Sequence, residues 1–193
     1  DDIVKNLIEF LHNNEELLIY DTFFKISSVT IKTESLQRIP TSKSIKINFN
    51  SPAYFSKIDS KFNGLFPEPE IVFANLMRTY DSVMDEKFGR DYYLLYLDWL
   101  KKSMNVSFYN LQTKKINSKS LRIGFIGTCT YVSNSDNEFI LTTNKLAKFA
   151  EYSNIGMERT AGFGVIKYES EQRREQKKQS PKQPLPMPQQ QQK

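Results

Sequence analysis

The order of helix and strand patterns over residues 43–169 restricts the fold more than any other feature of the sequence. SIKINFNSP alternates Ile45, Ile47 and Phe49 with polar residues, which predicts a half-buried strand that stops at Pro52. MNVSFYNLQT and LRIGFIGTCTYV predict two strands that form a hairpin through the polar turn KKINSKS. GFGVIKYE predicts a fourth strand near the end of this region.

Two helical patterns lie between these strands. FPEPEIVFANLMRTY has apolar residues at helical spacing and Pro69 in its first turn, and TTNKLAKFAEYS directs Leu146, Phe149 and Ala150 to one side. DYYLLYLDWLKK predicts an additional aromatic helix after the first of these. The order strand, helix, strand, strand, helix, strand defines the ferredoxin-like unit. We therefore predict an α+β fold, with a complete ferredoxin-like (βαββαβ) domain over residues 43–169 and two helices on one face of a four-stranded antiparallel sheet.

The flanking segments have other patterns. IVKNLIEFL predicts an amphipathic helix over residues 2–13, and FFKISSVTIKT predicts a strand from Phe23 to Thr33. We interpret residues 1–40 as the last helix and strand of another ferredoxin-like unit, whose beginning we expect to lie outside this chain. Residues 170–193 are rich in Gln, Pro and basic residues and lack aromatic side chains, which predicts a disordered basic tail.

Composition excludes several classes of site. The sequence holds one cysteine, Cys129, and one histidine, His12, so it has no internal disulfide and no multi-cysteine or paired-histidine metal motif. We interpret Cys129 as a buried apolar residue of a strand and His12 as an exposed residue of a helix. No apolar run in the sequence approaches the roughly 18 residues of a membrane span. We expect a cytoplasmic protein with no metal and no cofactor.

The formal net charge of +5 is unevenly distributed along the chain. Residues 1–100 carry 11 basic and 15 acidic side chains, a net charge of −4, whereas residues 101–167 carry 10 basic and 4 acidic side chains, a net charge of +6. A basic surface attracts phosphate backbones, so the second segment is expected to hold any nucleic-acid site.

Residues 154–168, NIGMERTAGFGVIKY, place three of the seven glycines within nine positions. AGFGVIKY is close to the aromatic-strand signature of RNA-recognition domains, but that signature lies on a third strand and this stretch reaches the last one. A glycine-rich loop fits better: Gly156, Gly162 and Gly164 allow left-handed backbone and bring N–H groups near an anion. Arg159 then supplies a planar fork for a phosphate or a base edge. The structural alternative is a turn in which the glycines only let a helix meet a strand.

Three motifs occur in order along the chain. FNSPAYF comes first, LFPEPEIVFANLMRTY second, and LAKFAEYSNIGMERTAGFG third. They resemble the motifs of the CRISPR-associated endoribonucleases that cut repeat RNA, a crRNA-maturation family of the glycine-rich-loop RAMP superfamily. The loop of that family reads glycine-hydrophobic-glycine, about five residues that include a Lys or Arg, then glycine-hydrophobic-glycine. Asn154 replaces the first glycine here, and Asn is the non-glycine residue that best tolerates a positive φ. The resemblance covers about residues 2–169.

The resemblance implies a protein that binds CRISPR repeat RNA and, when intact, cleaves it to generate guide RNAs. The implied reaction is attack by a ribose 2′-OH on its own 3′-phosphate, which needs acid–base groups and cationic stabilisation but no metal. The catalytic histidine of the family usually lies early in the first ferredoxin-like unit, a segment that we expect outside this chain, so no catalytic residue is assigned. The predicted RNA-binding residues are the cations of the hairpin and the residues of the loop: Lys114, Lys115, Lys119, Arg122, Asn154, Gly156, Arg159, Thr160, Gly162, Phe163 and Gly164.

Three functions are open on the sequence alone. The first is the endoribonuclease, or its RNA-binding portion. The second is a non-catalytic crRNA-binding subunit of a CRISPR interference complex, with other effector subunits or a second copy of the chain as partners. The third is a ferredoxin-like domain without an RNA partner, which the basic segment and the arginine-bearing loop disfavour.

Overall fold

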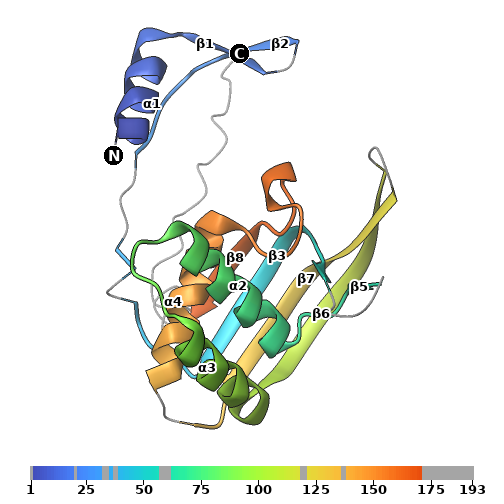
Figure 1. Ribbon diagram of the computed structural model, residues 1–193. Coiled ribbons are helices and arrows are strands. Elements are labelled where there is room, and N and C mark those ends of the chain that lie inside the picture. Colours follow the sequence, from blue (N-terminus) through green and yellow to red (C-terminus); the bar gives the residue numbers. More distant parts are fainter. Residues whose placement is uncertain are drawn as a thin grey trace, which may run out of the picture. The chain divides into compact units, whose positions relative to one another are not determined.

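The structure of the protein is a computed structural model (Figure 1). It describes residues 2–19, 21–31, 35–36, 39–56, 62–117, 121–135 and 138–170. The chain divides into two compact units, Asp1–Ser35 and Leu36–Lys193. The predicted disordered tail lies outside the described residues except for its first residue.

The larger unit contains a four-stranded antiparallel sheet with the strand order β6-β7-β3-β8. Its strands are β3 (Ser44–Ala53), β6 (Met104–Asn117), β7 (Leu121–Ser133) and β8 (Ile166–Ser170). The other elements are the helices α2 (Pro69–Val83), α3 (Arg90–Ser103) and α4 (Glu138–Ser153), the short strands β4 (Phe55–Ser56) and β5 (Asn63–Gly64), and a 3₁₀-helix, η1 (Arg159–Ala161). Helices α2 and α4 lie across one face of the sheet, and α3 packs against α2 (Figure 1). This is the ferredoxin-like arrangement, so the predicted α+β fold is confirmed.

The core lies between the sheet and the helices. Ile45, Ile47 and Phe49 of β3 are buried, as their alternation predicts, and so is Cys129 of β7. The apolar stripes predicted for the two helices are buried as well: Val72, Phe73, Leu76, Met77 and Tyr80 of α2, and Leu146, Phe149 and Ala150 of α4. Each large side chain removed from water stabilises the fold by roughly 1.5–3 kcal/mol, so these stripes fix which side of each helix faces the sheet.

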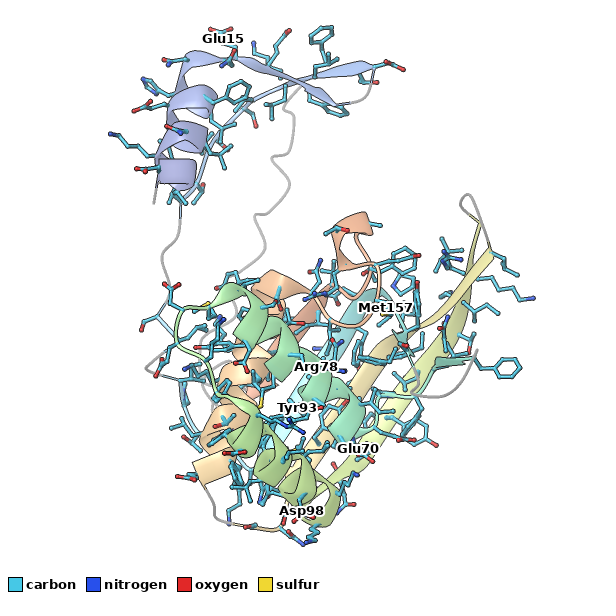
Figure 2. All side chains as sticks on the ribbon, viewed as in Figure 1. Glu15, Glu70, Arg78, Tyr93, Asp98 and Met157 are labelled. Atoms are coloured by element: carbon cyan, nitrogen blue, oxygen red, sulfur yellow. The ribbon has the colours of Figure 1, made fainter. Side chains whose placement is uncertain are left out.

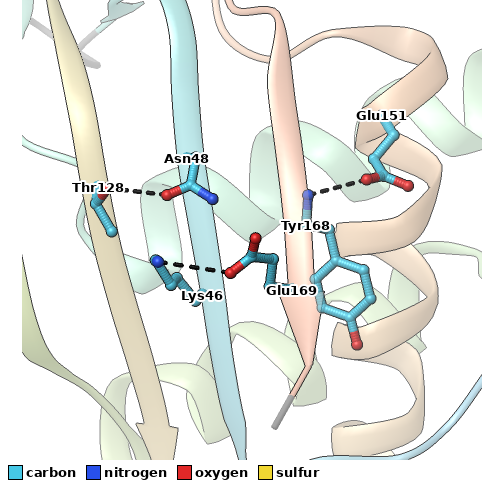
Figure 3. Close-up of polar contacts among 6 residues, drawn as sticks. All are labelled: Lys46, Asn48, Thr128, Glu151, Tyr168 and Glu169. Atoms are coloured by element: carbon cyan, nitrogen blue, oxygen red, sulfur yellow. Dashed lines mark hydrogen bonds and ion pairs between the residues drawn. The ribbon is translucent and has the colours of Figure 1, made fainter. Parts of the chain in front are cut away.

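The opposite face of the sheet carries polar side chains (Figure 3). Lys46 Nζ lies 3.5 Å from Glu169 Oε2 between β3 and β8, and Thr128 Oγ1 donates to Asn48 Oδ1 at 2.9 Å between β7 and β3. Figure 3 shows these side chains in front of the strands, with helices behind. The sheet therefore has one buried and one polar face, as is common for antiparallel sheets.

A buried asparagine joins α4 to distant parts of the unit. Asn144 Nδ2 donates to the carbonyl of Ser42 at 3.0 Å, and its Oδ1 accepts from the Tyr168 hydroxyl at 2.6 Å. Asn144 is fully buried, and an unpaired amide there would cost free energy. These bonds fix how α4 lies along β8, the strand that follows the glycine-rich segment.

The boundaries of three elements around the sheet differ from the predictions, besides those of the β6–β7 hairpin. The strand predicted to stop at Pro52 continues to Ala53 across a register shift, where a residue without an N–H is tolerated. Helix α4 begins at Glu138, not Thr142, and the hydroxyls of Thr142 and Thr143 form hydrogen bonds with tyrosines of α3. The last strand begins at Ile166, because the preceding glycines have left-handed backbone that a strand cannot contain.

The smaller unit contains α1 (Asp2–Asn13), β1 (Glu16–Ile19) and β2 (Thr22–Lys25). The predicted helix is confirmed, and His12 is exposed on it. The predicted strand from Phe23 to Thr33 is wrong, because β2 ends at Lys25 and forms a short hairpin with β1. ELLI and TFFK form two strands joined by a two-residue connection, so the chain turns back within the segment instead of continuing as one strand. The assignment of this unit to a first ferredoxin-like domain stays a prediction.

Candidate nucleic-acid interface

The glycine-rich loop, defined here as residues 154–165, connects α4 to β8. Asn154 has a left-handed backbone with φ of 57°, as expected for an Asn in place of a glycine, and its Nδ2 donates to the carbonyl of Arg159 at 3.2 Å. Figure 2 shows Met157 in this loop. The loop thus closes on itself from its first residue, which gives it a defined shape before any ligand binds.

Gly156 and Gly164 occupy points of close backbone approach. A Cβ on Gly164 would lie 1.8 Å from the carbonyl oxygen of Ile155, and one on Gly156 would lie 2.5 Å from that of Tyr54. The N–H of Gly156 donates to Asn75 Oδ1 at 3.0 Å, and that of Gly164 donates to the Pro52 carbonyl at 2.9 Å. The expectation that these two N–H groups face an anion is therefore wrong: they bond within the protein and hold the loop in shape.

Gly162 differs from the other two glycines. It is exposed, has φ of 84°, and a Cβ there would meet no atom within 4 Å. Its carbonyl accepts from Ser51 Oγ at 2.8 Å, and the same Oγ accepts from the N–H of Val165 at 2.8 Å. Ser51 belongs to the FNSPAYF motif. Its hydroxyl therefore links that motif to the glycine-rich loop by two hydrogen bonds.

Arg159 and Thr160 form the outer part of the loop. Arg159 begins the 3₁₀-helix η1 and is half-buried, whereas Thr160 is exposed. Both line a hollow together with Tyr152 and Met157. The Arg159 guanidinium has no hydrogen bond or ion pair with any residue that the structure describes. The geometry therefore leaves it available to a ligand at the surface.

The aromatic residue of the loop, Phe163, packs on a buried tyrosine. Its ring meets that of Tyr54 edge to face, with 5.8 Å between ring centroids. Tyr54 is 4% exposed, and burial is the main cause that raises the pKa of its hydroxyl. Phe163 therefore has a structural role in the loop, because its ring packs against Tyr54.

The basic hairpin of β6 and β7 is longer than predicted. Lys114 and Lys115 lie within β6, opposite Gly124 and Ile123 of β7, and not in a turn. Neighbouring residues of a strand point to opposite faces, so Lys114 shares a face with Arg122 whereas Lys115 points to the other side. Lys119 lies outside the described residues. Of the three described cations, Lys114 and Arg122 therefore share one face of the hairpin, and Lys115 lies on the other.

Arg122 of β7 contacts the glycine-rich loop directly. Its Nε–H donates to Glu158 Oε1 at 2.8 Å. This hydrogen bond lowers the pKa of the Glu158 carboxyl and raises the pKa of the Arg122 guanidinium. The structure therefore brings the predicted hairpin and the predicted loop together through Glu158, which is not among the predicted RNA-binding residues.

The interface also involves residues that local sequence patterns did not reveal as functional: Ser51, Tyr54, Asn75 and Glu158. Each acts on a partner at least 36 residues away in the sequence. Ser51 and Tyr54 lie in FNSPAYF, which resembles a family motif, so the sequence marks this stretch but not what its residues do. No group of three or more His, Cys, Asp or Glu able to hold a metal occurs among the described residues, and no helix among them could span a membrane.

Comparison with known proteins gives consistent matches. The family model described as "CRISPR-associated endoribonuclease Cas6" matches residues 47–166. The CRISPR-associated endoribonuclease Cas6 of Streptococcus thermophilus is 25% identical over 185 residues, which cover 84% of this chain and 74% of that protein.

Two solved structures share the fold. A Cas6 product complex has a TM-score of 0.71 at 21% identity and covers 88% of this chain and 74% of its own. The Thermus thermophilus Cas6 has a TM-score of 0.64 at 17% identity over 69% of this chain, which spans 56% of that structure. At this identity the structures establish the ferredoxin-like fold alone. The family model covers more than half of the sequence, including Arg122 of the hairpin and Glu158 of the loop. The chain belongs to the CRISPR-associated endoribonuclease Cas6 family.

Proposed function

We propose that the protein binds CRISPR repeat RNA through its glycine-rich loop and the adjoining face of the β6–β7 hairpin, and that the intact enzyme cleaves this RNA to generate guide RNAs. The observation that carries the proposal is the family match over residues 47–166, which includes Arg122 and the whole glycine-rich loop with Arg159. The relative solved as a product complex supports it.

The proposed reaction is metal-independent. The 2′-OH of the nucleotide before the cut attacks the adjacent phosphate, the bond to the next 5′-oxygen breaks, and the products are a cyclic phosphate and a 5′-OH. Cations at the phosphate stabilise the charge that develops on it, and we assign this role to Arg159 as part of the proposal. His12 is exposed in the smaller unit and is not assigned as the acid or base.

The test uses end-labelled repeat RNA incubated with the intact, full-length protein in excess EDTA. A shorter product ending in a cyclic phosphate is expected, because the reaction needs no metal. A strict requirement for Mg²⁺ would contradict the mechanism. A repeat with a 2′-deoxy nucleotide before the cut is the matched control, and it should bind but stay intact.

The alternative is a non-catalytic crRNA-binding subunit of an interference complex. It predicts tight binding of the repeat with no product under any of these conditions. Failure to bind the repeat above the level of an unrelated RNA of equal length would contradict both functions.

A further inference from the structure

The glycine-rich loop contains one acidic residue, Glu158, beside Arg159. A carboxylate in a loop that meets a phosphate backbone repels its ligand. Glu158 also has a left-handed backbone, with φ of 52° and ψ of 33°, a conformation that is unfavourable for a residue with a Cβ. Two unfavourable features at one position indicate that its side chain has a specific task.

The surroundings of Glu158 identify that task. Its carboxylate accepts the Nε–H of Arg122 at 2.8 Å, and the two side chains are 33% and 36% exposed. The backbone is fixed on both sides, because the Met157 N–H donates to the Tyr54 carbonyl at 3.0 Å and the Ala161 N–H donates to the Glu158 carbonyl at 2.9 Å. The carboxylate is therefore held in place, and it holds the guanidinium in turn.

The atom that Arg122 uses matters. Glu158 accepts the Nε–H, and the Tyr54 hydroxyl is a further hydrogen-bond partner of both side chains. The Nε–H contact does not use the two terminal nitrogens, which carry four of the five N–H donors of a guanidinium, so donors remain there as a fork. A fork of fixed orientation matches two oxygens of a phosphate. Holding it before binding reduces the conformational entropy that would be lost on binding.

We propose that Glu158 is a positioning residue that orients Arg122 toward a phosphate of the bound RNA beside the glycine-rich loop. This inference rests on the proposed function, since it assigns a role within that RNA site. It differs from two simpler roles. A carboxylate that only competes with RNA for Arg122 would weaken binding, and one that only stabilises the loop would affect folding but not affinity.

The test compares four proteins: the wild type, Glu158→Gln, Arg122→Gln and the double variant. Repeat RNA affinity and melting temperature are measured for each at one salt concentration. Long-range electrostatics alone predicts tighter binding when a negative charge is removed. Positioning predicts the opposite sign, with Glu158→Gln weaker on the order of tenfold, as for a lost charge-assisted hydrogen bond. The double variant should bind no more weakly than Arg122→Gln, because both changes remove one contact.

Two further variants separate charge and backbone effects. Glu86→Gln removes the same charge from another exposed ion-paired glutamate, 3.7 Å from Lys145, and should not weaken binding. Glu158→Gly relieves the left-handed backbone and removes the carboxylate, so it should lose affinity as Glu158→Gln does. Unchanged or tighter binding by Glu158→Gln, wild-type affinity in Glu158→Gly, or additive losses in the double variant would each overturn the inference. A wild type that fails to bind the repeat would overturn the proposed function and this inference with it.

Discussion

Arg122 illustrates how a distant residue changes the role that a local pattern suggests. The sequence places it among cations of a hairpin, whereas the structure attaches it to Glu158 in a loop 36 residues later. A short-range pattern cannot reveal such a pair, because the pair exists only once β7 and the loop are packed. Charged residues in the interface can be predicted from composition, but their orientation cannot.

The Arg122–Glu158 contact predicts a pH-dependent contribution to stability. Arg122 lowers the pKa of Glu158 below its usual value near 4.5, so the contact stabilises the folded state at neutral pH, and this stabilisation is lost as the pH falls through the folded-state pKa. The difference in melting temperature between the wild type and Glu158→Gln should therefore shrink as the pH is lowered from 7 to 3. Tyr54 is the other titratable group beside the contact, and it stays protonated over this range. A difference independent of pH would contradict the contact.

Cys129 should be unreactive in the folded protein. It is fully buried in β7, and burial raises the pKa of its thiol to about 11. The reactive thiolate is therefore scarce at pH 8. A thiol reagent such as iodoacetamide should label the protein only in denaturant, as measured by mass spectrometry. Rapid labelling under native conditions would show that the core is open at this strand.

At the scale of elements, the sheet and the two covering helices could be predicted, because their apolar residues repeat at strand and helix periods. The start of α4, the start of β8 and the hairpin β1–β2 could not be predicted, because contacts in turns and at helix ends determine where these elements begin. The glycine-rich loop was located from its composition. The direction of its N–H groups depends on Asn75 and Pro52, which lie at least 79 residues before it.

The glycines of the loop should differ in tolerance. Gly164→Ala places a Cβ 1.8 Å from a carbonyl oxygen and at a positive φ, so we expect a loss of unfolding free energy above about 3 kcal/mol. Gly162→Ala adds only the left-handed strain, about 1–2 kcal/mol, because no atom lies within 4 Å. Urea denaturation measures both values. Equal losses would show that contacts around Gly164 are looser than described.

The two lysines of β6 should also differ. Lys114 shares a face with Arg122 and Lys115 does not. If that face meets RNA, Lys114→Ala should weaken binding and reduce the slope of log affinity against log salt by about one, as for one lost phosphate contact. Lys115→Ala is the matched control and should leave the slope unchanged. A larger effect from Lys115 would place the RNA on the other face of the hairpin.

At the scale of the whole molecule, charge and family membership agree. The segment of net charge +6, residues 101–167, supplies the hairpin cations, α4 and the glycine-rich loop. The acidic first 100 residues contribute β3 and α2, which support the loop through Ser51, Pro52 and Asn75. The basic residues are thus concentrated where the proposed site lies, and the acidic half of the chain provides its framework.

The measurement that most directly tests an RNA site at the glycine-rich loop is made on Arg159→Ala. Melting temperature and repeat RNA affinity are determined side by side, with Arg90→Ala on α3 as a control of equal charge. The Arg159 side chain has no hydrogen-bond or ion-pair partner among the described residues, so its loss should leave the melting temperature nearly unchanged. Its loss should weaken RNA binding by about 1–3 kcal/mol, the range for a hydrogen bond to a charged group, whereas Arg90→Ala should have a smaller effect. A destabilised Arg159→Ala protein that binds the repeat as tightly as the wild type would contradict the account.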